Sequence, residues 1–187
     1  MNLVTTNVLN IEFYSRDAET VAKDLLGTTL IYQFGDVIQR SRIVETEAYV
    51  GTHDLASHAS KGRTKRTEVM FGPPGHAYVY LIYGMYDMLN IVTGADGDAQ
   101  AVLIRAVEPL ENISGKTDGP GKLTRTLGIT RALNQHALSN EPLWLEPGTP
   151  PQEVITTPRI GIDYAKEWKD APLRFYDAES RFVSRKR

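Results

Sequence analysis

Apolar and polar positions alternate with two different periods along the first fifty residues. In residues 18–26 the apolar positions recur every three or four residues, as on one face of a helix, with Ser15 placed to cap it and Gly27 to end it. Residues 28–34 are apolar and rich in strand-forming types. A Gly-Asp pair follows, which predicts a tight turn into a second strand over residues 37–50.

The middle of the chain is interrupted by glycine and proline. Residues 51–76 are predicted to be mostly loop, with room for a short helix over residues 53–58 capped by Thr52. Residues 77–83 have the composition of a strand, and the glycine that follows permits a tight turn. Residues 87–93 are predicted to return as a second strand, so that the two form a protruding hairpin.

The second half of the chain predicts shorter elements. These are a strand at 101–107, a helix at 123–127 after a Gly-Pro-Gly sequence, and edge strands at 144–145 and 160–162. The chain has no internal repeat and no domain linker. We therefore expect one α+β domain over residues 1–187, built around a curved, largely antiparallel sheet with a protruding β-hairpin and a few surface helices. Residues 177–187 are expected to form a basic tail.

Composition narrows the class of protein. The chain has 187 residues, of which 41% are hydrophobic, and this is enough for a packed core. It has no cysteine, which excludes a disulfide scaffold, a thiolate metal site and a cysteine nucleophile. No apolar run approaches the roughly 18 residues of a membrane span, and no leader pattern opens the chain. A cytoplasmic protein without membrane contact is expected.

The charge of the chain is close to balanced but unevenly distributed. A net charge of −2 argues against a protein that coats nucleic acid without specificity. Lys61, Arg63, Lys65 and Arg66 nevertheless fall within six residues without an acid. Such a basic patch can hold a short length of phosphate backbone.

Residues 42–49 predict a strand that carries two carboxylates. Strict alternation along the strand puts Ile43, Glu45, Glu47 and Tyr49 on one face, with neighbours roughly 6–7 Å apart. Unpaired acids at this spacing do not suit a dry core. They suit a pocket in which one carboxylate polarises water beside a planar ligand. An exposed strand face with solvated acids is the alternative.

Aromatic residues gather on the predicted hairpin. Its first strand carries Tyr78, Tyr80 and Tyr83, and its tip reads Tyr-Gly-Met-Tyr through Met85 and Tyr86. Turn residues normally face water, so an apolar aromatic tip is suited to enter a base stack from the minor groove. Tyrosines packed beneath a neighbouring hairpin are the alternative.

Arg105 interrupts an apolar strand. A buried arginine needs an anionic partner, which Glu45, Glu47 or a phosphate could supply. The alternative is an edge-strand arginine that reaches solvent.

A metal-dependent hydrolase is a further reading of the same region. His53, Asp54 and His58 could combine with the two carboxylates of the strand, but their spacing matches no strong zinc pattern. No phosphate-binding loop, nucleotide-binding glycine fingerprint or nucleophile elbow is present. We expect no bound metal and no cofactor.

Taken together, these segments resemble the alkyladenine (3-methyladenine) DNA glycosylase family. The resemblance extends from about Phe13 to Tyr176, and one departure is Thr67, where the family often has asparagine. The matching pieces are Arg42-Ile-Val-Glu-Thr-Glu-Ala-Tyr49, His58, Met70-Phe-Gly-Pro-Pro-Gly-His-Ala-Tyr-Val-Tyr-Leu-Ile-Tyr-Gly-Met-Tyr86, Asn90, Val102-Leu-Ile-Arg-Ala-Val-Glu-Pro-Leu110, Gly119-Pro-Gly-Lys-Leu123, and the late runs 158–162 and 172–176.

The resemblance implies a bacterial, monofunctional DNA glycosylase of base excision repair. Such an enzyme flips an alkylated or deaminated purine out of double-stranded DNA and hydrolyses its N-glycosidic bond. The expected lesions are 3-methyladenine, 7-methylguanine, hypoxanthine and ethenoadenine. We expect a monomer without an obligate protein partner, associated with the nucleoid in the cytoplasm.

The resemblance also assigns roles to residues. Glu47 matches the carboxylate that activates water for attack at C1′, Arg105 matches a residue beside that water, and Glu45 matches an acid that is not the usual base. The base pocket is expected to include Tyr49, His58, Tyr80 and Asn90, the last excluding the amino group of guanine. The intercalating tip is expected to be Tyr83, Met85 and Tyr86. The DNA backbone is expected to contact Lys61, Arg63, Lys65 and Arg66.

Two rival functions remain open at this point. A non-catalytic sensor of damaged or single-stranded nucleic acid would use the same aromatic residues but would bind without releasing base. A metal-dependent hydrolase would lose its activity with a chelator.

Overall fold

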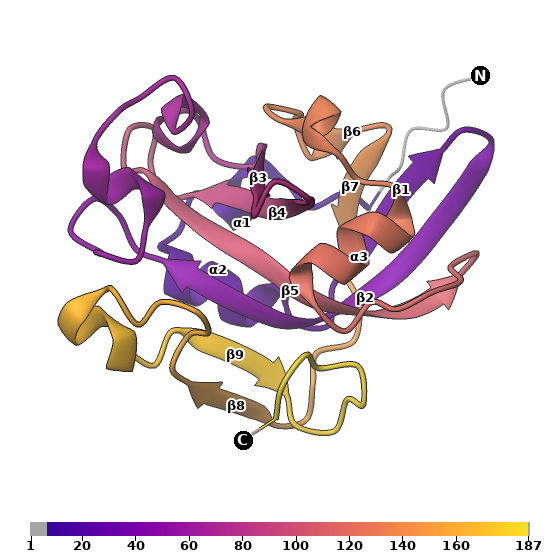
Figure 1. The fold of residues 1–187 in the computed structure, drawn as a ribbon. Coiled ribbons are helices and arrows are strands. Elements are labelled where there is room, and N and C mark those ends of the chain that lie inside the picture. Colours follow the sequence, from indigo (N-terminus) through magenta and orange to yellow (C-terminus); the bar gives the residue numbers. More distant parts are fainter. Residues whose placement is uncertain (1–6, 187) are drawn as a thin grey trace.

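A single curled antiparallel sheet organises residues 7–186, which are the residues that the computed structural model describes (Figure 1). All strand pairings recorded among these residues are antiparallel. This confirms the predicted α+β fold around a curved sheet. The strands are β1 (Thr29–Phe34), β2 (Val37–Tyr49), β3 (Ala77–Ile82), β4 (Tyr86–Thr93), β5 (Gln100–Glu111), β6 (Ser139–Asn140), β7 (Leu143–Glu146), β8 (Val154–Thr157) and β9 (Arg174–Asp177).

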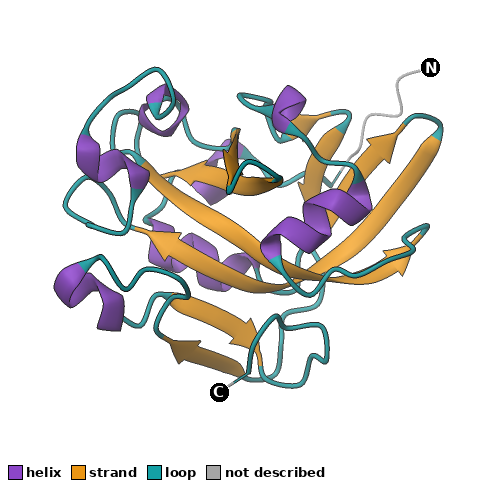
Figure 2. Cartoon of the chain, viewed as in Figure 1, coloured by secondary structure: helices purple, strands orange, loops and turns teal. Residues whose placement is uncertain are grey.

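The long strand β2 lies at the centre of the sheet, whose main path runs β3-β4-β5-β2-β1-β7-β6. One edge of β2 pairs with β5. The other edge pairs with β1 over its first half and with β9 around Glu45 and Glu47, and β8 joins β9 on the outside. The part of β2 that carries Glu45 and Glu47 is therefore flanked by β5 on one side and β9 on the other. Figure 2 shows these strands as neighbouring orange ribbons.

Short helices cover parts of this sheet. The α-helices are α1 (Ile11–Tyr14), α2 (Ala18–Leu25) and α3 (Pro120–Leu127), and the 3-10 helices are η1 (His58–Lys61), η2 (Glu68–Phe71), η3 (Arg131–Leu133) and η4 (Lys166–Asp170). The predicted apolar stripe of α2 is fully buried. Its cap, however, is Asp17, whose side chain accepts from the Thr20 amide, because Ser15 already ends α1. In 7–186, no helix has the length and apolarity needed to span a membrane.

Two adjacent β-bulges break the alternation predicted for β2. Ile43 pairs with Val107 but Glu45 pairs with Ala106, so that Val44 is an extra residue in β2. The next pair joins Thr46 to Ile104, which makes Arg105 an extra residue in β5. Beyond each extra residue, the side chains point to the opposite face of the sheet from the one that strict alternation predicts. The prediction that Ile43 shares a face with Glu45 is therefore wrong, because Ile43 belongs to the main core beneath α2.

Three further sequence predictions differ from the structure. The helix predicted over residues 53–58 is absent: residues 53–57 form turns, and the 3-10 helix η1 begins only at His58, with Ser57 as its cap. Residues 160–162 form a bend rather than an edge strand. Strands β8 and β9 were not expected, because their flanking prolines and charged residues obscure a strand pattern in the sequence.

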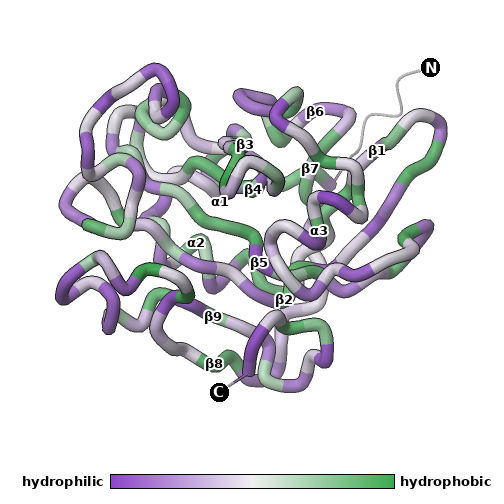
Figure 3. The backbone as a smooth tube through the Cα atoms, in the orientation of Figure 1, coloured by the Kyte–Doolittle hydropathy of each residue, from purple (hydrophilic) through white to green (hydrophobic). Residues whose placement is uncertain are grey.

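The segment after β9 folds back onto the sheet. Val183 is buried in a small apolar cluster with Val44, Ala106 and Tyr176. Residues 178–186 therefore do not extend as a free tail, although Arg181, Arg185 and Lys186 remain exposed. In Figure 3 the middle of β5 is coloured as hydrophobic, and residues of β5 and α2 belong to one buried cluster, so the main core lies between the sheet and α2.

Candidate active site

A cavity lies against β2, β3, β4 and β5, each of which contributes residues to its lining. Its volume of about 240 Å³ lies below the roughly 300–1,000 Å³ typical of sites for drug-sized ligands, so it suits a ligand as small as one nucleobase. The side chains that line it are mostly aromatic or aliphatic. The polar and aromatic lining residues are Glu47, Tyr49, Ser57, His58, Tyr78, Tyr80, Tyr83, Asn90, Arg105 and Tyr164.

Three rings from two elements form one side of this cavity. The His58 ring lies 4.4 Å from the Tyr80 ring, and Tyr80 lies 5.3 Å from Tyr78. The Tyr78 hydroxyl and Nδ1 of His58 form a hydrogen bond of 3.0 Å. Tyr78 is also buried in a small hydrophobic cluster. The alternative that these tyrosines pack in the protein interior is therefore correct for Tyr78, which also lines the cavity. Tyr78 was not among the residues predicted to form the base pocket.

His58 is neutral at physiological pH. Burial of the ring, together with the positive charges of Arg66 and Lys61, lowers the pKa of His58 to about 4. A neutral imidazole has one donor and one acceptor nitrogen, and it does not repel a cationic ligand.

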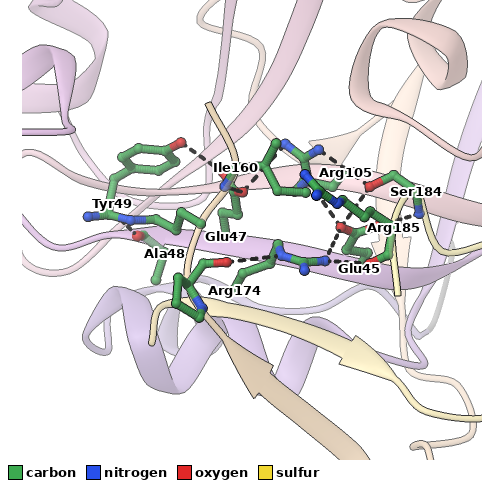
Figure 4. Close-up of polar contacts among 11 residues, drawn as sticks. Glu45, Glu47, Ala48, Tyr49, Arg105, Ile160, Arg174, Ser184 and Arg185 are labelled. Atoms are coloured by element: carbon green, nitrogen blue, oxygen red, sulfur yellow. Dashed lines mark hydrogen bonds and ion pairs between the residues drawn. The ribbon is translucent and has the colours of Figure 1, made fainter. Parts of the chain in front are cut away.

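Glu47 is fully buried but lines the cavity. Its Oε2 accepts a hydrogen bond of 2.9 Å from the Tyr49 hydroxyl, and its Oε1 accepts one of 2.8 Å from the Ile160 backbone amide (Figure 4). Nη1 of Arg105 lies 3.4 Å from Oε1. The exposed, solvated strand face considered from the sequence is therefore wrong for this residue. Nothing in the sequence indicated the Ile160 amide, because the contact joins residues 113 positions apart.

Glu45 is also fully buried but does not line the cavity. Its carboxylate receives Nε of Arg105 at 3.1 Å and Nη1 of Arg174 at 2.9 Å. It also accepts from the Ser184 amide at 2.7 Å and the Ser184 hydroxyl at 2.8 Å. These four donors use the hydrogen-bonding capacity of a carboxylate. Glu45 is thus enclosed by donors from arginine and serine groups and does not face the cavity.

Arg105 lies between the two carboxylates. Burial alone would lower the pKa of its guanidinium, but the charges of Glu47 and Glu45 outweigh this effect and raise the pKa. The predicted anionic partner of Arg105 is therefore found, and the alternative of an arginine that reaches solvent is wrong.

Tyr49 is held from beneath by a second ion pair. The guanidinium of Arg159 lies 4.8 Å from the centre of the Tyr49 ring and binds Asp54 through contacts of 2.6 and 2.9 Å. Burial, and then the neighbouring charge of Glu47, raises the pKa of Tyr49. The phenol therefore keeps its proton and donates a hydrogen bond to Glu47. Arg159 lies in the late run 158–162, but no role was predicted for it, because its partner Asp54 is 105 residues away.

The amide of Asn90 is fixed in the cavity wall. Its Nδ2 donates to the backbone carbonyls of Tyr78 at 3.2 Å and Met88 at 3.4 Å. The side chain is almost completely buried and cannot swing away without losing both bonds.

The hairpin between β3 and β4 projects beside the cavity. Tyr83 is 79% exposed at its tip, in a left-handed conformation with φ of 53°, and Met85 is 60% exposed. Tyr86 is placed differently, with its ring 5.1 Å from the Arg125 guanidinium and against α3 at Gly121. The structure thus brings Tyr83 and Met85 to the tip but holds Tyr86 under α3.

The basic residues of the loop before β3 are exposed but differ in their contacts. Arg66 lies next to the cavity, where its guanidinium is 5.2 Å from the Tyr80 ring and donates to the Leu81 carbonyl. Arg63 forms an ion pair of 3.1 Å with Glu68. Lys61 and Lys65 are exposed. Thr67 stabilises this loop from within, through hydrogen bonds to Thr64 and Gly62.

The side chains considered for a metal site have other partners. His53 packs edge-on against Trp168 at 5.4 Å, Asp54 binds Arg159, and His58 contacts Tyr78. Within residues 7–186 no group of three His, Cys, Asp or Glu side chains is arranged to hold a metal ion.

An aromatic cavity of the size of one base, a buried carboxylate at its wall and an exposed hairpin beside it are features expected of an enzyme that acts on a nucleobase. Residues 12–181 match the family model described as Methylpurine-DNA glycosylase (MPG). The chain belongs to this family, and it is a DNA glycosylase of DNA repair that hydrolyses N-glycosyl bonds.

Similar proteins carry a consistent name. A Myxococcus xanthus protein is 52% identical over 183 residues, which cover 96% of this chain and 94% of that protein. A protein from Legionella pneumophila (strain Lens) is 53% identical over 175 residues, with 92% and 96% coverage. A protein from Methanocella arvoryzae is 49% identical over 193 residues, with 96% coverage of each chain. Each is named "Putative 3-methyladenine DNA glycosylase".

Proposed function

We propose that this glycosylase acts as a monomer on double-stranded DNA in the cytoplasm and removes alkylated and deaminated purines. The proposed substrates are 3-methyladenine, 7-methylguanine, hypoxanthine and ethenoadenine, and Glu47 is the proposed base. The observation that carries this proposal is the position of Glu47, which is the buried carboxylate that lines the aromatic cavity.

Extrusion of the base comes first. Unstacking and unpairing one nucleotide costs a few kcal/mol, which an inserted side chain and phosphate contacts offset. Tyr83 is proposed to fill the gap in the duplex, with Met85 beside it, because both are exposed at the hairpin tip. Lys61, Arg63, Lys65 and Arg66 are proposed to face the DNA backbone. Each phosphate contact among them would steepen the plot of log binding constant against log salt concentration by about one unit of slope.

The extruded base is proposed to bind among Tyr49, His58, Tyr78 and Tyr80. Purines alkylated at N3 or N7 carry a positive charge, and electron-rich tyrosine faces attract such rings by about 0.5–2 kcal/mol. The low pKa of His58 keeps its ring uncharged, so that it does not oppose this attraction. Asn90 is proposed to exclude guanine, because its tethered amide cannot move away from an exocyclic amine.

Hydrolysis then follows at C1′. The bond between C1′ and the purine nitrogen breaks, and the electron pair leaves with the base. This neutralises a cationic purine, whereas a neutral purine such as hypoxanthine must also take up a proton as it leaves. The oxygen of a water molecule oriented by Glu47 bonds to C1′, and Glu47 accepts the proton of that water. The negative charge of Glu47 also stabilises the oxocarbenium-like transition state. Nη1 of Arg105 lies 3.4 Å from Oε1 of Glu47, while Tyr49 bonds the other carboxylate oxygen, so a positive charge stands beside the proposed base.

The test compares Glu47→Gln with the wild type in single-turnover release of free base from methylated duplex DNA, with and without a chelator. Glutamine keeps the size of the side chain but not its charge, so release is expected to fall by about 100-fold or more with affinity for the DNA unchanged. Wild-type release by the variant would refute the role of Glu47. Binding without base release by the wild type would favour the sensor, and loss of release with the chelator would favour a metal-dependent hydrolase.

A further inference from the structure

The segment that follows β9 reaches the back of the active site. Val183 anchors it by packing with Val44, the extra residue of the bulge in β2. On the other side, the carbonyl of Arg185 accepts a hydrogen bond of 2.9 Å from Nη1 of Arg174. Ser184 is therefore fixed at both neighbours, directly beside Glu45, as Figure 4 shows.

Ser184 contacts both members of a buried ion pair. Its amide donates to Oε2 of Glu45 at 2.7 Å, and its hydroxyl donates to Oε1 at 2.8 Å. The same hydroxyl oxygen accepts from Nη2 of Arg105 at 3.3 Å. Hydrogen bonds to charged groups are stronger than bonds between neutral groups, and burial strengthens them further.

These contacts determine where the guanidinium of Arg105 lies. Its Nε binds Glu45 at 3.1 Å, its Nη2 binds Ser184 at 3.3 Å, and its Nη1 lies 3.4 Å from Glu47. A guanidinium is planar and rigid, so fixing two of its nitrogens also fixes the third. The contacts of Arg105 with Glu45 and Ser184 therefore determine its distance from Glu47.

We propose that Ser184 is a positioning residue for base release, which holds Arg105 at the separation from Glu47 seen here. The inference rests on the proposed role of Glu47 as the base. Without the hydroxyl, Arg105 loses its restraint at Nη2 and can close onto Glu47. It would then occupy the carboxylate oxygen that must orient the water.

The test is single-turnover release of base from methylated duplex DNA by Ser184→Ala. We expect release to slow by about tenfold, the factor that corresponds to one charge-assisted hydrogen bond, with unchanged affinity for the DNA, when both proteins are assayed well below their melting temperatures. Ser184→Thr keeps the hydroxyl and should restore the rate. Ser180→Ala is the matched control, because Ser180 is buried in the same segment but bonds the Phe182 amide instead.

A double variant separates positioning from general loss of structure. If Ser184 acts through Arg105, Ser184→Ala should cause no further slowing in an Arg105→Gln background. Equal slowing in both backgrounds, wild-type release by Ser184→Ala, or failure of Ser184→Thr to restore the rate would overturn the inference. If Glu47→Gln releases base slowly but Ser184→Ala releases it at the wild-type rate, the inference about Ser184 fails and the proposed function stands. Wild-type release by Glu47→Gln would overturn the proposed function and this inference together.

Discussion

At the scale of single residues, Glu45 and Glu47 have the same side chain but different surroundings. Glu45 accepts four bonds from arginine and serine groups and has no contact with the cavity. Glu47 accepts from one phenol and one amide, lies farther from Arg105, and lines the cavity. The number of donors around each carboxylate therefore distinguishes a structural anion from a group that can hold a water molecule.

Asn90 gives a prediction about specificity. Asn90→Ser shortens a side chain that two backbone carbonyls hold in the cavity wall. The space this leaves should admit the exocyclic amine of guanine, so release of undamaged guanine is expected to rise by about tenfold or more. Release of guanine and of hypoxanthine from matched duplexes measures the effect. If the ratio of the two rates does not change, Asn90 has no part in excluding guanine.

His58 gives a prediction about pH and stability. Its pKa is about 4 in the folded protein and 6.5 in a model peptide, so the unfolded chain binds more protons between these values. The folded state is therefore most favoured above pH 6.5, and this contribution is lost as the pH falls towards 4. Because the ring is partly exposed, we expect a loss of only about 1 kcal/mol, or 2–4 °C in melting temperature.

The measurement is the melting temperature of the wild type and of His58→Gln between pH 7.5 and 5. The wild type should lose more stability than the variant over this range, because glutamine does not titrate. Parallel curves would mean that His58 binds protons equally in the folded and unfolded states.

At the scale of elements, the hairpin of β3 and β4 places Tyr83 outside the folded body. Tyr83→Ser should slow excision from duplex DNA by about 100-fold, which corresponds to an unstacking cost of a few kcal/mol. Excision of the same lesion from an unpaired or extruded position should change little. Tyr86→Ser is a useful comparison, because Tyr86 packs under α3 at Gly121. Equal losses for Tyr83→Ser on both substrates would assign Tyr83 to the pocket rather than to the duplex.

The elements also show what the sequence could predict. The stripe of α2, the hairpin of β1 and β2 and the hairpin of β3 and β4 follow from local periodicity and turn residues, and the structure contains all three. The paired bulges at Val44 and Arg105 are not local features. They exist only when β2 and β5 are paired, so alternation along one strand could not predict which way Ile43 points.

The same limit applies to the site. Residues on motifs shared with the family, such as Glu47, Tyr49 and His58, could be named from the sequence, and the structure brings them to one cavity. The roles of Ile160, Arg159 and Ser184 could not be predicted. The first acts through its backbone, and the other two act on partners that only the complete fold brings close.

At the scale of the whole molecule, three ion pairs surround the carboxylate of Glu47. Arg159 and Asp54 pair beneath Tyr49. Arg105 lies beside Glu47 itself, and Arg174 pairs with Glu45 on the side away from the cavity. Breaking one member of a buried pair leaves the other charge without compensation, which typically costs 3–5 kcal/mol. Substitutions behind the site therefore act on stability as well as on catalysis.

The cluster around Glu45 also connects distant parts of the polypeptide. Its partners Arg105, Arg174 and Ser184 are 60, 129 and 139 residues away along the chain. Contacts of such long sequence separation carry a large loop-closure cost and form slowly. During refolding from denaturant, we expect helical circular dichroism to return before base-releasing activity. Enzymatic activity would then report the completion of folding rather than the formation of any one part.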